Sequence, residues 1–254
     1  MTQSGTMPAL RNYSAKQFSQ LVARLDPNSQ RELTQLLERR EQYELWSQVA
    51  KPVACWEAGP LLWLTSHTFT EDHHSLAKGT EFLAPFPRDE YIRVLVDYIL
   101  FEQCLDANAS NVLFVLKTRE MMFSWTAVGL ITWMCQFLNV FWVAQSGKES
   151  KGAELVNYAR ILWRNQPAWM KRRNPLVVDN DLELQWKSGG RFKAIASGED
   201  QIRMFHPHGY MQDESSFLPE AEQAFNAARP VVAQIICGST DEVGWFSRQC
   251  KGLV

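Results

Sequence analysis

Three short groups of polar residues in this sequence have side chains suited to binding a phosphate group and a metal ion. Residues 117–124 begin with a lysine, which can neutralise phosphate charge, and end with a serine, whose hydroxyl can ligate Mg²⁺. Asp213 and Glu214 form an acidic pair, and residues 238–240 read Gly-Ser-Thr. Phosphoryl transfer to water requires positioning and charge neutralisation more than covalent chemistry, and these residue types can supply both.

The first group lies between a predicted strand and a predicted helix. Residues 112–116 form an apolar run of strand length, and residues 121–138 are apolar over the length of a helix. A strand, a turn and a helix N-terminus in this order form the place where α/β proteins bind phosphate, because free N–H groups point at the anion. Met122 and Phe123 stand where the standard loop has its second glycine and its lysine. The stretch alone is therefore also compatible with a core helix after an ordinary charged turn.

The other two groups follow predicted strands as well. Residues 209–214 end in the acidic pair, and the apolar run 231–236 comes shortly before the Gly-Ser-Thr group. Between them, residues 218–228 have the pattern of a helix. A strand, a helix and a strand connected in this way lie parallel in one sheet, joined by a right-handed crossover. The sequence therefore predicts an α/β fold.

Further predicted elements must surround these groups. In chain order they are a helix over residues 16–25, a helix from Pro27 onward, an irregular stretch over residues 51–87, a helix over residues 89–105, a strand over residues 140–144, a helix over residues 153–164 and a hairpin over residues 182–196.

Composition narrows the class of protein. The 254 residues are 46% hydrophobic, enough for a sizeable core. The formal charge of −2 gives no overall nucleic-acid signature, so a DNA contact needs a local basic face. The densest basic group is Arg160, Arg164 and residues 171–173, which suits a phosphate backbone and equally an ordinary solvated helix end. Polar residues within 121–138 favour a buried helix over a membrane span.

The order of the three polar groups is that of a P-loop ATPase motor. Residues 117–125, KTREMMFSW, resemble the pattern Lys-Ser/Thr-Arg-x-Met-Met-x-Ser-Trp found in large terminase subunits of tailed bacteriophages, whose ATPase domain packages DNA into a procapsid. The resemblance runs from about residue 56 to residue 241. It implies a P-loop NTPase domain of the ASCE type over residues 56–254, with a central, mainly parallel sheet flanked by helices, and a helical N-terminal extension over residues 1–55.

The chemistry and the resemblance together give each residue of the site an expected role. Lys117 would contact the β- and γ-phosphates of ATP, and Ser124 and Asp213 would hold Mg²⁺. Glu214 would polarise the attacking water. The resemblance makes Arg119 the Walker A arginine and Arg203 an arginine finger that acts on a neighbouring subunit's ATP. The residues expected to bind the nucleotide are Lys117, Thr118, Arg119, Glu120, Met121, Met122, Phe123, Ser124, Gly238, Ser239 and Thr240, of which the last three match a motif that couples the γ-phosphate to the motor.

The resemblance implies an ATP hydrolase that uses ATP and Mg²⁺ to drive double-stranded DNA into a procapsid in the cytoplasm of a bacterial host. Its expected partners are double-stranded DNA, further copies of the chain in a ring on the portal, and the small terminase subunit, with no membrane. The family's nuclease domain has no counterpart in these residues, so we expect no DNA cleavage. Two alternatives stay open. One is a helicase-like DNA translocase, which would keep Gly-Lys-Thr where this chain has residues 122–124; the other is a degenerate NTPase fold that serves as an assembly scaffold.

Overall fold

The computed structural model describes residues 19–20, 22–71, 83–104, 111–118 and 121–252. The chain forms two compact units, Met1–Trp46 and Ser47–Val254. Most of the first unit's described part is the helix α2 (Pro27–Val49). The carboxylate of Asp26 accepts the N–H groups of Asn28 and Ser29 at 3.0 and 3.1 Å, which is how an N-cap aspartate starts a helix. The predicted helix from Pro27 onward is confirmed. Of the predicted helix over residues 16–25, residues 19, 20 and 22 are helical, residues 23–25 form a turn and a bend, and residues 16–18 and 21 lie outside the described residues.

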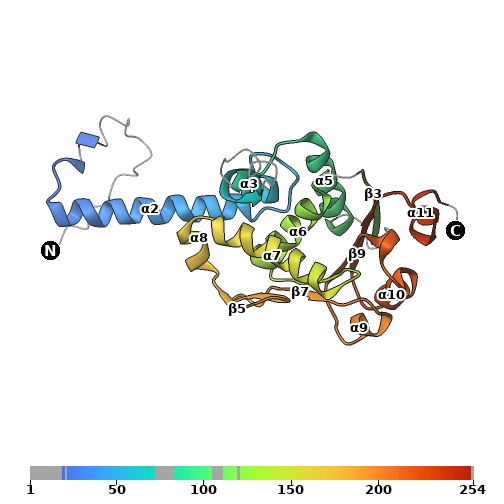
Figure 1. Ribbon diagram of the computed structural model, residues 1–254. Coiled ribbons are helices and arrows are strands. Elements are labelled where there is room, and N and C mark those ends of the chain that lie inside the picture. Colours follow the sequence, from blue (N-terminus) through green and yellow to red (C-terminus); the bar gives the residue numbers. More distant parts are fainter. Residues whose placement is uncertain (1–18, 21, 72–82, 105–110, 119–120, 253–254) are drawn as a thin grey trace. The chain divides into compact units, whose positions relative to one another are not determined.

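The second unit is built on a seven-stranded sheet with the order β3-β9-β8-β4-β7-β6-β5 (Figure 1). Its strands are β3 (Val112–Leu116), β4 (Phe141–Gln145), β5 (Leu176–Asn180), β6 (Glu183–Trp186), β7 (Arg191–Ile195), β8 (Gly209–Asp213) and β9 (Gln234–Ser239). From β3 to β7 all neighbours are parallel, and β6 and β5 add an antiparallel edge. An additional strand, β9, separates β3 from the acid-bearing β8. The predicted α/β fold of the ASCE type, with a mainly parallel sheet, is thus confirmed.

Helices cover both faces of this sheet (Figure 1). The helices of the second unit are α3 (Gly59–His67), α5 (Glu90–Cys104), α6 (Phe123–Trp133), α7 (Glu149–Asn165), α8 (Ala168–Arg173), α9 (Glu199–Arg203), α10 (Ala221–Ala228) and α11 (Trp245–Cys250), with a short hairpin of β1 (Phe69–Glu71) and β2 (Leu83–Pro85). Successive side chains of a strand point to opposite faces of the sheet, and two neighbouring residues of β7 illustrate this. Ala194 lies against Gly152 of α7, while Ile195 joins the apolar cluster of Ile202 in α9 and Phe225 in α10.

The central helix α6 is buried nearly all round, as its uniformly apolar sequence predicts. It packs against α3, α5 and α7, and it continues as one π-helical segment, Met134–Leu138. Within the part of the chain that the structure describes, no helix combines the length and the apolar character needed to span a membrane.

Three sequence predictions need correction. Residues 51–87 are not irregular throughout, because Gly59, with φ of 68°, and Pro60 form the start of α3, where both residues are favourable. The predicted strand over residues 231–236 is β9 (Gln234–Ser239), so Gly238 and Ser239 lie inside the strand and not after it. The predicted helix over residues 218–228 starts only at Ala221, after a 3₁₀ turn at Ser215–Phe217. Apolar runs mark burial, but they do not fix where a strand begins.

Candidate functional site

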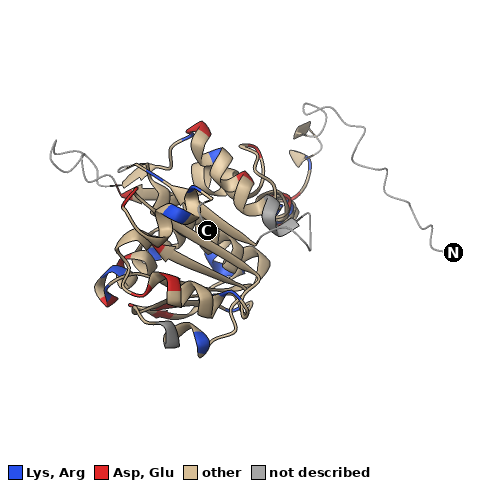
Figure 2. Cartoon of the chain, turned by 90° about the vertical axis from the view of Figure 1, so that its right-hand side faces the viewer, with Lys and Arg blue, Asp and Glu red and all other residues tan. Residues whose placement is uncertain are grey.

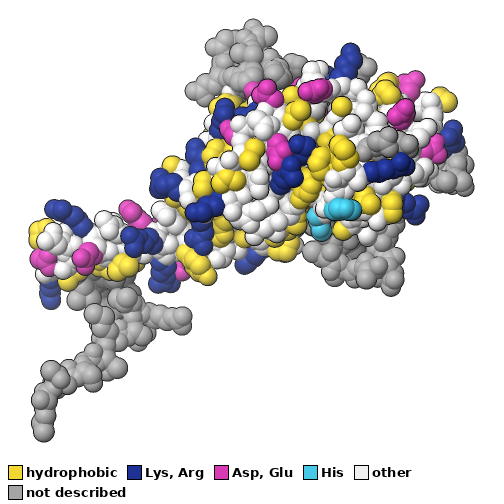
Figure 3. Space-filling view, turned by 90° about the horizontal axis from the view of Figure 1, so that it is seen from below, with side chains coloured by type: hydrophobic (Ala, Val, Ile, Leu, Met, Phe, Trp, Pro, Cys, Tyr) yellow, Lys and Arg dark blue, Asp and Glu magenta, His cyan; other side chains and the backbone are white. Residues whose placement is uncertain are grey.

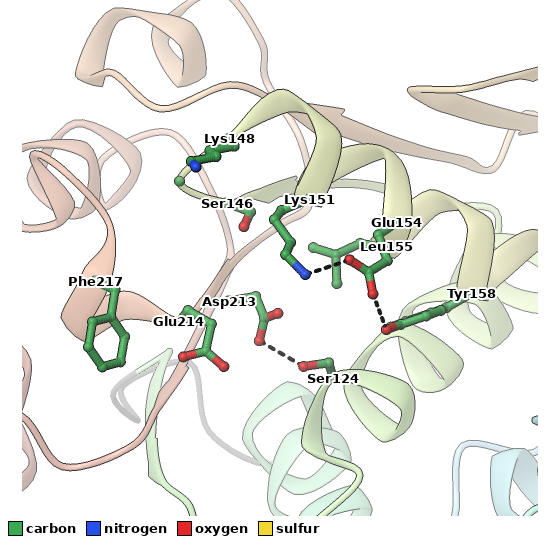
Figure 4. A pocket seen from close by; sticks show the side chains of 11 residues that line it. Ser124, Ser146, Lys148, Lys151, Glu154, Leu155, Tyr158, Asp213, Glu214 and Phe217 are labelled. Carbon is green, nitrogen blue, oxygen red and sulfur yellow. Dashed lines mark hydrogen bonds and ion pairs between the residues drawn. The ribbon is translucent and has the colours of Figure 1, made fainter. Parts of the chain in front are cut away.

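The carboxyl end of the parallel sheet brings the basic loop and the acidic pair together. Lys117 directly follows β3, and Asp213 ends β8. The ammonium group of Lys117 lies 3.0 Å from Oε1 of Glu214. The hydroxyl of Ser124 donates to Oδ1 of Asp213 at 2.9 Å, as Figure 4 shows. These partners are 97 and 89 residues apart in the chain. A cation, a hydroxyl and two carboxylates therefore meet at one place.

The loop after β3 has an unusual backbone conformation at its end. Met122 precedes the first turn of α6 with φ of 51° and ψ of 23°, in the left-handed region. Its carbonyl accepts the N–H of Thr126 at 2.8 Å. A non-glycine residue is strained in this region, and strain of this kind gathers at functional sites. Met122 thus adopts a left-handed conformation at the position where the standard loop has a glycine.

The buried side chain of Phe123 explains the glycine in β9. Phe123 is 3% exposed, and a Cβ atom on Gly238 would lie 2.0 Å from its ring. The ammonium group of Lys117 lies 5.4 Å from the centre of the same ring. Phe123 therefore occupies the sequence position of the standard lysine as a buried support beneath Lys117.

The Gly-Ser-Thr group of β9 connects the two halves of the site. The carbonyl of Ser239 accepts the N–H of Lys117 at 2.9 Å, and its hydroxyl accepts the N–H of Ser216 at 3.1 Å. The carbonyl of Thr240 accepts the hydroxyl of Ser216 at 3.0 Å. Because Ser216 comes two residues after Glu214, these hydrogen bonds connect the basic loop with the segment after the acidic pair.

The electrostatics of Asp213 suit a bound cation. Asp213 is 9% exposed, and burial raises the pKa of its carboxyl group, against the opposing effects of Lys117 and the hydrogen bond from Ser124. A divalent cation would offset the cost of keeping this carboxylate charged. The oxygen atoms of Ser124 and Asp213 are the hard ligands that Mg²⁺ prefers, and Mg²⁺ commonly completes its shell with water and phosphate oxygens. The residues present therefore fit the predicted Mg²⁺ ion.

The site opens into a cavity of about 430 Å³ that the sequence did not predict (Figure 4). The cavity is lined by Ser124, Asp213 and Glu214 on one side and by residues between β4 and α7 and in α7 on the other. The additional lining residues are Ser146, Gly147, Lys148, Lys151, Glu154, Leu155, Tyr158 and Phe217. The signal for them was indirect: β4 was predicted as a strand, and residues after a parallel strand reach the same edge of the sheet.

A second cavity, of about 390 Å³, runs along β3 on the other side of the loop. It is mainly apolar, and its aromatic rings come from Tyr91 and Tyr98 in α5 and from Phe114 and Phe123.

The remaining predicted residues lie in different places. Thr118 is exposed at the loop, and Met121 lines the second cavity. Arg119 and Glu120 lie outside the described residues. Arg203 is exposed at the end of α9, before the amino end of β8, and the strand itself then rises about 13 Å to Asp213. The role of Arg203 on the ATP of a neighbouring subunit stays a prediction.

The basic group predicted around residues 160–173 is partly engaged in structural contacts. Arg160 is 8% exposed and lies 2.6 Å from Asp179, and Arg164 lies 3.1 Å from the same carboxylate. Lys171 donates to the carbonyl of Arg164 and lies over the ring of Trp163. Figure 2 shows basic and acidic residues interspersed along the chain, and Figure 3 shows basic side chains interspersed with acidic and apolar ones on the face that it draws. Both arginines bind Asp179 and so connect α7 to β5, while DNA contact by the basic group stays a prediction.

We expect residue 122 to show a measurable preference for glycine. Met122→Gly and Met122→Ala both remove the side chain, but only glycine adopts the left-handed conformation without a steric cost. The glycine variant should therefore have a free energy of unfolding about 1 kcal/mol above that of the alanine variant. Urea denaturation of the two proteins measures this difference. Equal stabilities would contradict the left-handed conformation of residue 122.

No protein-family model and no curated protein matches this sequence. Among solved structures, the chain is similar to the large terminase of bacteriophage HK97, with 10% identity and a TM-score of 0.48, over 61% of this chain and 33% of that protein. It is also similar to the ATPase domain of the large terminase of Thermus phage P74-26, with 11% identity and a TM-score of 0.42, over 63% of this chain and 72% of that one. The chain thus spans about a third of the HK97 protein. By its own strand order and by the loop after β3, the chain has an α/β P-loop NTPase fold, and the solved structures named here as similar to it are phage large terminases.

Proposed function

We propose that this chain is the ATPase motor domain of a terminase-like DNA-packaging protein, which hydrolyses ATP with Mg²⁺ to drive double-stranded DNA into a procapsid. The observation that carries the proposal is the pairing of Lys117 with Glu214 and of Ser124 with Asp213 at the carboxyl ends of parallel strands. These are the cation, the hydroxyl and the two carboxylates that hydrolysis of a nucleoside triphosphate needs.

The pairing also gives a reason why Glu214 becomes available to act on water only when ATP is bound. Without nucleotide, Lys117 neutralises Glu214 at 3.0 Å and occupies the carboxylate that would act on water. The phosphate groups of ATP compete for Lys117, and Glu214 is then released. Ser124 and Asp213 would hold Mg²⁺, which neutralises charge that develops on the phosphate oxygens. Glu214 accepts the proton of the attacking water while the bond between the β- and γ-phosphates breaks and ADP leaves.

The wider partners follow from the same proposal. We assign the base of the nucleotide to the apolar cavity beside Tyr91 and Tyr98, where its ring can stack. Arg203, exposed on α9, would act on the ATP of the next copy of the chain in a ring. We further propose that the protein acts on double-stranded DNA together with the small terminase subunit and the portal, in the cytoplasm of a bacterial host.

One observation favours the scaffold alternative. Met122 and Phe123 put bulky side chains where the standard loop has a glycine and a lysine, and bulk limits how closely a backbone can approach phosphate. A protein that retained the fold but not the activity would fail to bind ATP. Measurement of ATP binding and hydrolysis by the parent protein separates the two functions.

Replacement of Lys117 tests the assignment at its centre. Lys117→Ala should weaken ATP binding roughly ten- to hundredfold and slow hydrolysis, because a charged hydrogen-bond donor to the phosphates is lost. The partner left behind, Glu214, is 44% exposed, so the fold should survive. Titration calorimetry and a steady-state assay give affinity and rate, with Lys187→Ala, an exposed lysine in the turn between β6 and β7, as the control. Unchanged binding by Lys117→Ala would make the loop an ordinary turn.

A further inference from the structure

A second lysine lines the cavity on the side opposite the basic loop. Lys151 lies in the first turn of α7, and Figure 4 shows its side chain extending toward Ser124 and Asp213, whereas Lys148 points away. The position follows from the sheet. Strand β4 pairs with β8 in parallel, Gln145 opposite Gln212, so the segment after β4 emerges beside the acidic pair.

The charges around Lys151 favour its protonated form. Its pKa is raised by the hydrogen bond from its ammonium group to Glu154, and also by the charges of Glu154, Asp213 and Glu214. Lys117 approaches the acidic pair from β3 and Lys151 from the side of β4. The carboxylates therefore lie between two cations that come from different elements.

The partner of Lys151 in this structure holds it only weakly. Its ammonium group lies 2.8 Å from Glu154, but the side chain of Lys151 is 65% exposed, and solvent screens exposed pairs. Glu154 itself is better fixed, because Tyr158 donates a hydrogen bond to it at 2.8 Å. The ring of Tyr158 in turn stacks on Trp125, with 4.1 Å between ring centres, next to Ser124. Glu154 thus holds Lys151 beside the site without preventing its release.

We propose that Lys151 is a catalytic-site cation which exchanges Glu154 for an oxygen of the γ-phosphate when ATP enters the cavity. This inference rests on the proposed function. The strand order β3-β9-β8-β4 decides which phosphate is meant. A phosphate chain bound at the loop after β3 extends across β9 toward β8, so its terminal group is the part nearest to the segment after β4. ADP, which lacks that group, does not reach Lys151.

The test compares binding of ADP with binding of a non-hydrolysable ATP analogue, in the presence of Mg²⁺, for the parent, Lys151→Ala, Lys151→Arg and Lys148→Ala. Lys151→Ala should weaken binding of the ATP analogue roughly ten- to hundredfold, because a charged hydrogen bond is lost. The affinity for ADP should stay within about twofold of the parental value. Lys151→Arg should restore much of the loss, because a guanidinium group also binds phosphate. Lys148→Ala, which removes a cation from the same cavity wall, should leave the ratio of the two affinities unchanged.

The outcomes separate this inference from the proposed function. Suppose that ATP binding by the parent depends on Lys117. If Lys151→Ala then loses affinity equally for ADP and the ATP analogue, or loses none for either, the proposed role of Lys151 is overturned. A parent that binds neither nucleotide would overturn both proposals together. Because the Lys151 side chain is largely exposed, its replacement should not alter the unfolding temperature, so a selective loss for the ATP analogue reports on the site and not on folding.

Discussion

Glu214→Gln is expected to abolish ATP hydrolysis while ATP still binds. The amide keeps the shape of the side chain and can still accept a hydrogen bond from Lys117, but it cannot take a proton from water. The loss of a general base reduces the rate by about 10²- to 10⁴-fold. Steady-state hydrolysis together with a binding titration separates the two effects.

A matched control is available in the same segment of the chain. Glu220 has nearly the same left-handed conformation as Glu214, with φ of 57° against 58°, but it is exposed at the start of α10 and does not line the cavity. Glu220→Gln should therefore hydrolyse ATP like the parent. Turnover by Glu214→Gln at the parental rate would remove Glu214 from its proposed role.

The second large effect is expected at Arg203. Arg203 is exposed at the end of α9, and we propose that it acts on the ATP of a neighbouring copy. An arginine that stabilises transition-state charge can contribute about 10³-fold or more to the rate. Hydrolysis per molecule should thus rise with protein concentration, and Arg203→Ala should remove that rise while nucleotide affinity stays almost unchanged. Arg229→Ala, an exposed arginine at the end of α10, is the control.

Mixing two inactive proteins decides whether Arg203 acts between subunits. In a mixture of Arg203→Ala and Glu214→Gln, some interfaces combine an intact Glu214 with an intact Arg203 from the neighbour. These interfaces should regain activity in proportion to their number. If activity stays absent at every mixing ratio, under conditions in which the parent assembles, Arg203 does not act in trans.

The sequence alone determined the elements that carry the chemistry. The apolar run before Lys117 predicted β3, and the long apolar stretch predicted α6, which is buried nearly all round. Strand β8 is buried over its whole length, although the residues before Asp213 are not uniformly apolar. The order of the polar groups predicted an α/β P-loop fold and the four residues that meet at the carboxyl end of the sheet. This inference succeeds because parallel strands all present their carboxyl ends at one edge.

The tertiary structure decided which elements are neighbours. Burial patterns do not reveal that β9 lies between β3 and β8, that Phe123 packs on Gly238 beneath Lys117, or that Asp179 binds Arg160 and removes it from a basic face. They also left Lys151 among ordinary surface residues, since an exposed lysine near the start of a helix has no distinguishing sequence signal. The physical reason is that hydrophobic periodicity records whether a residue is buried, whereas the partner of a side chain depends on strand order and on contacts between residues far apart in the chain.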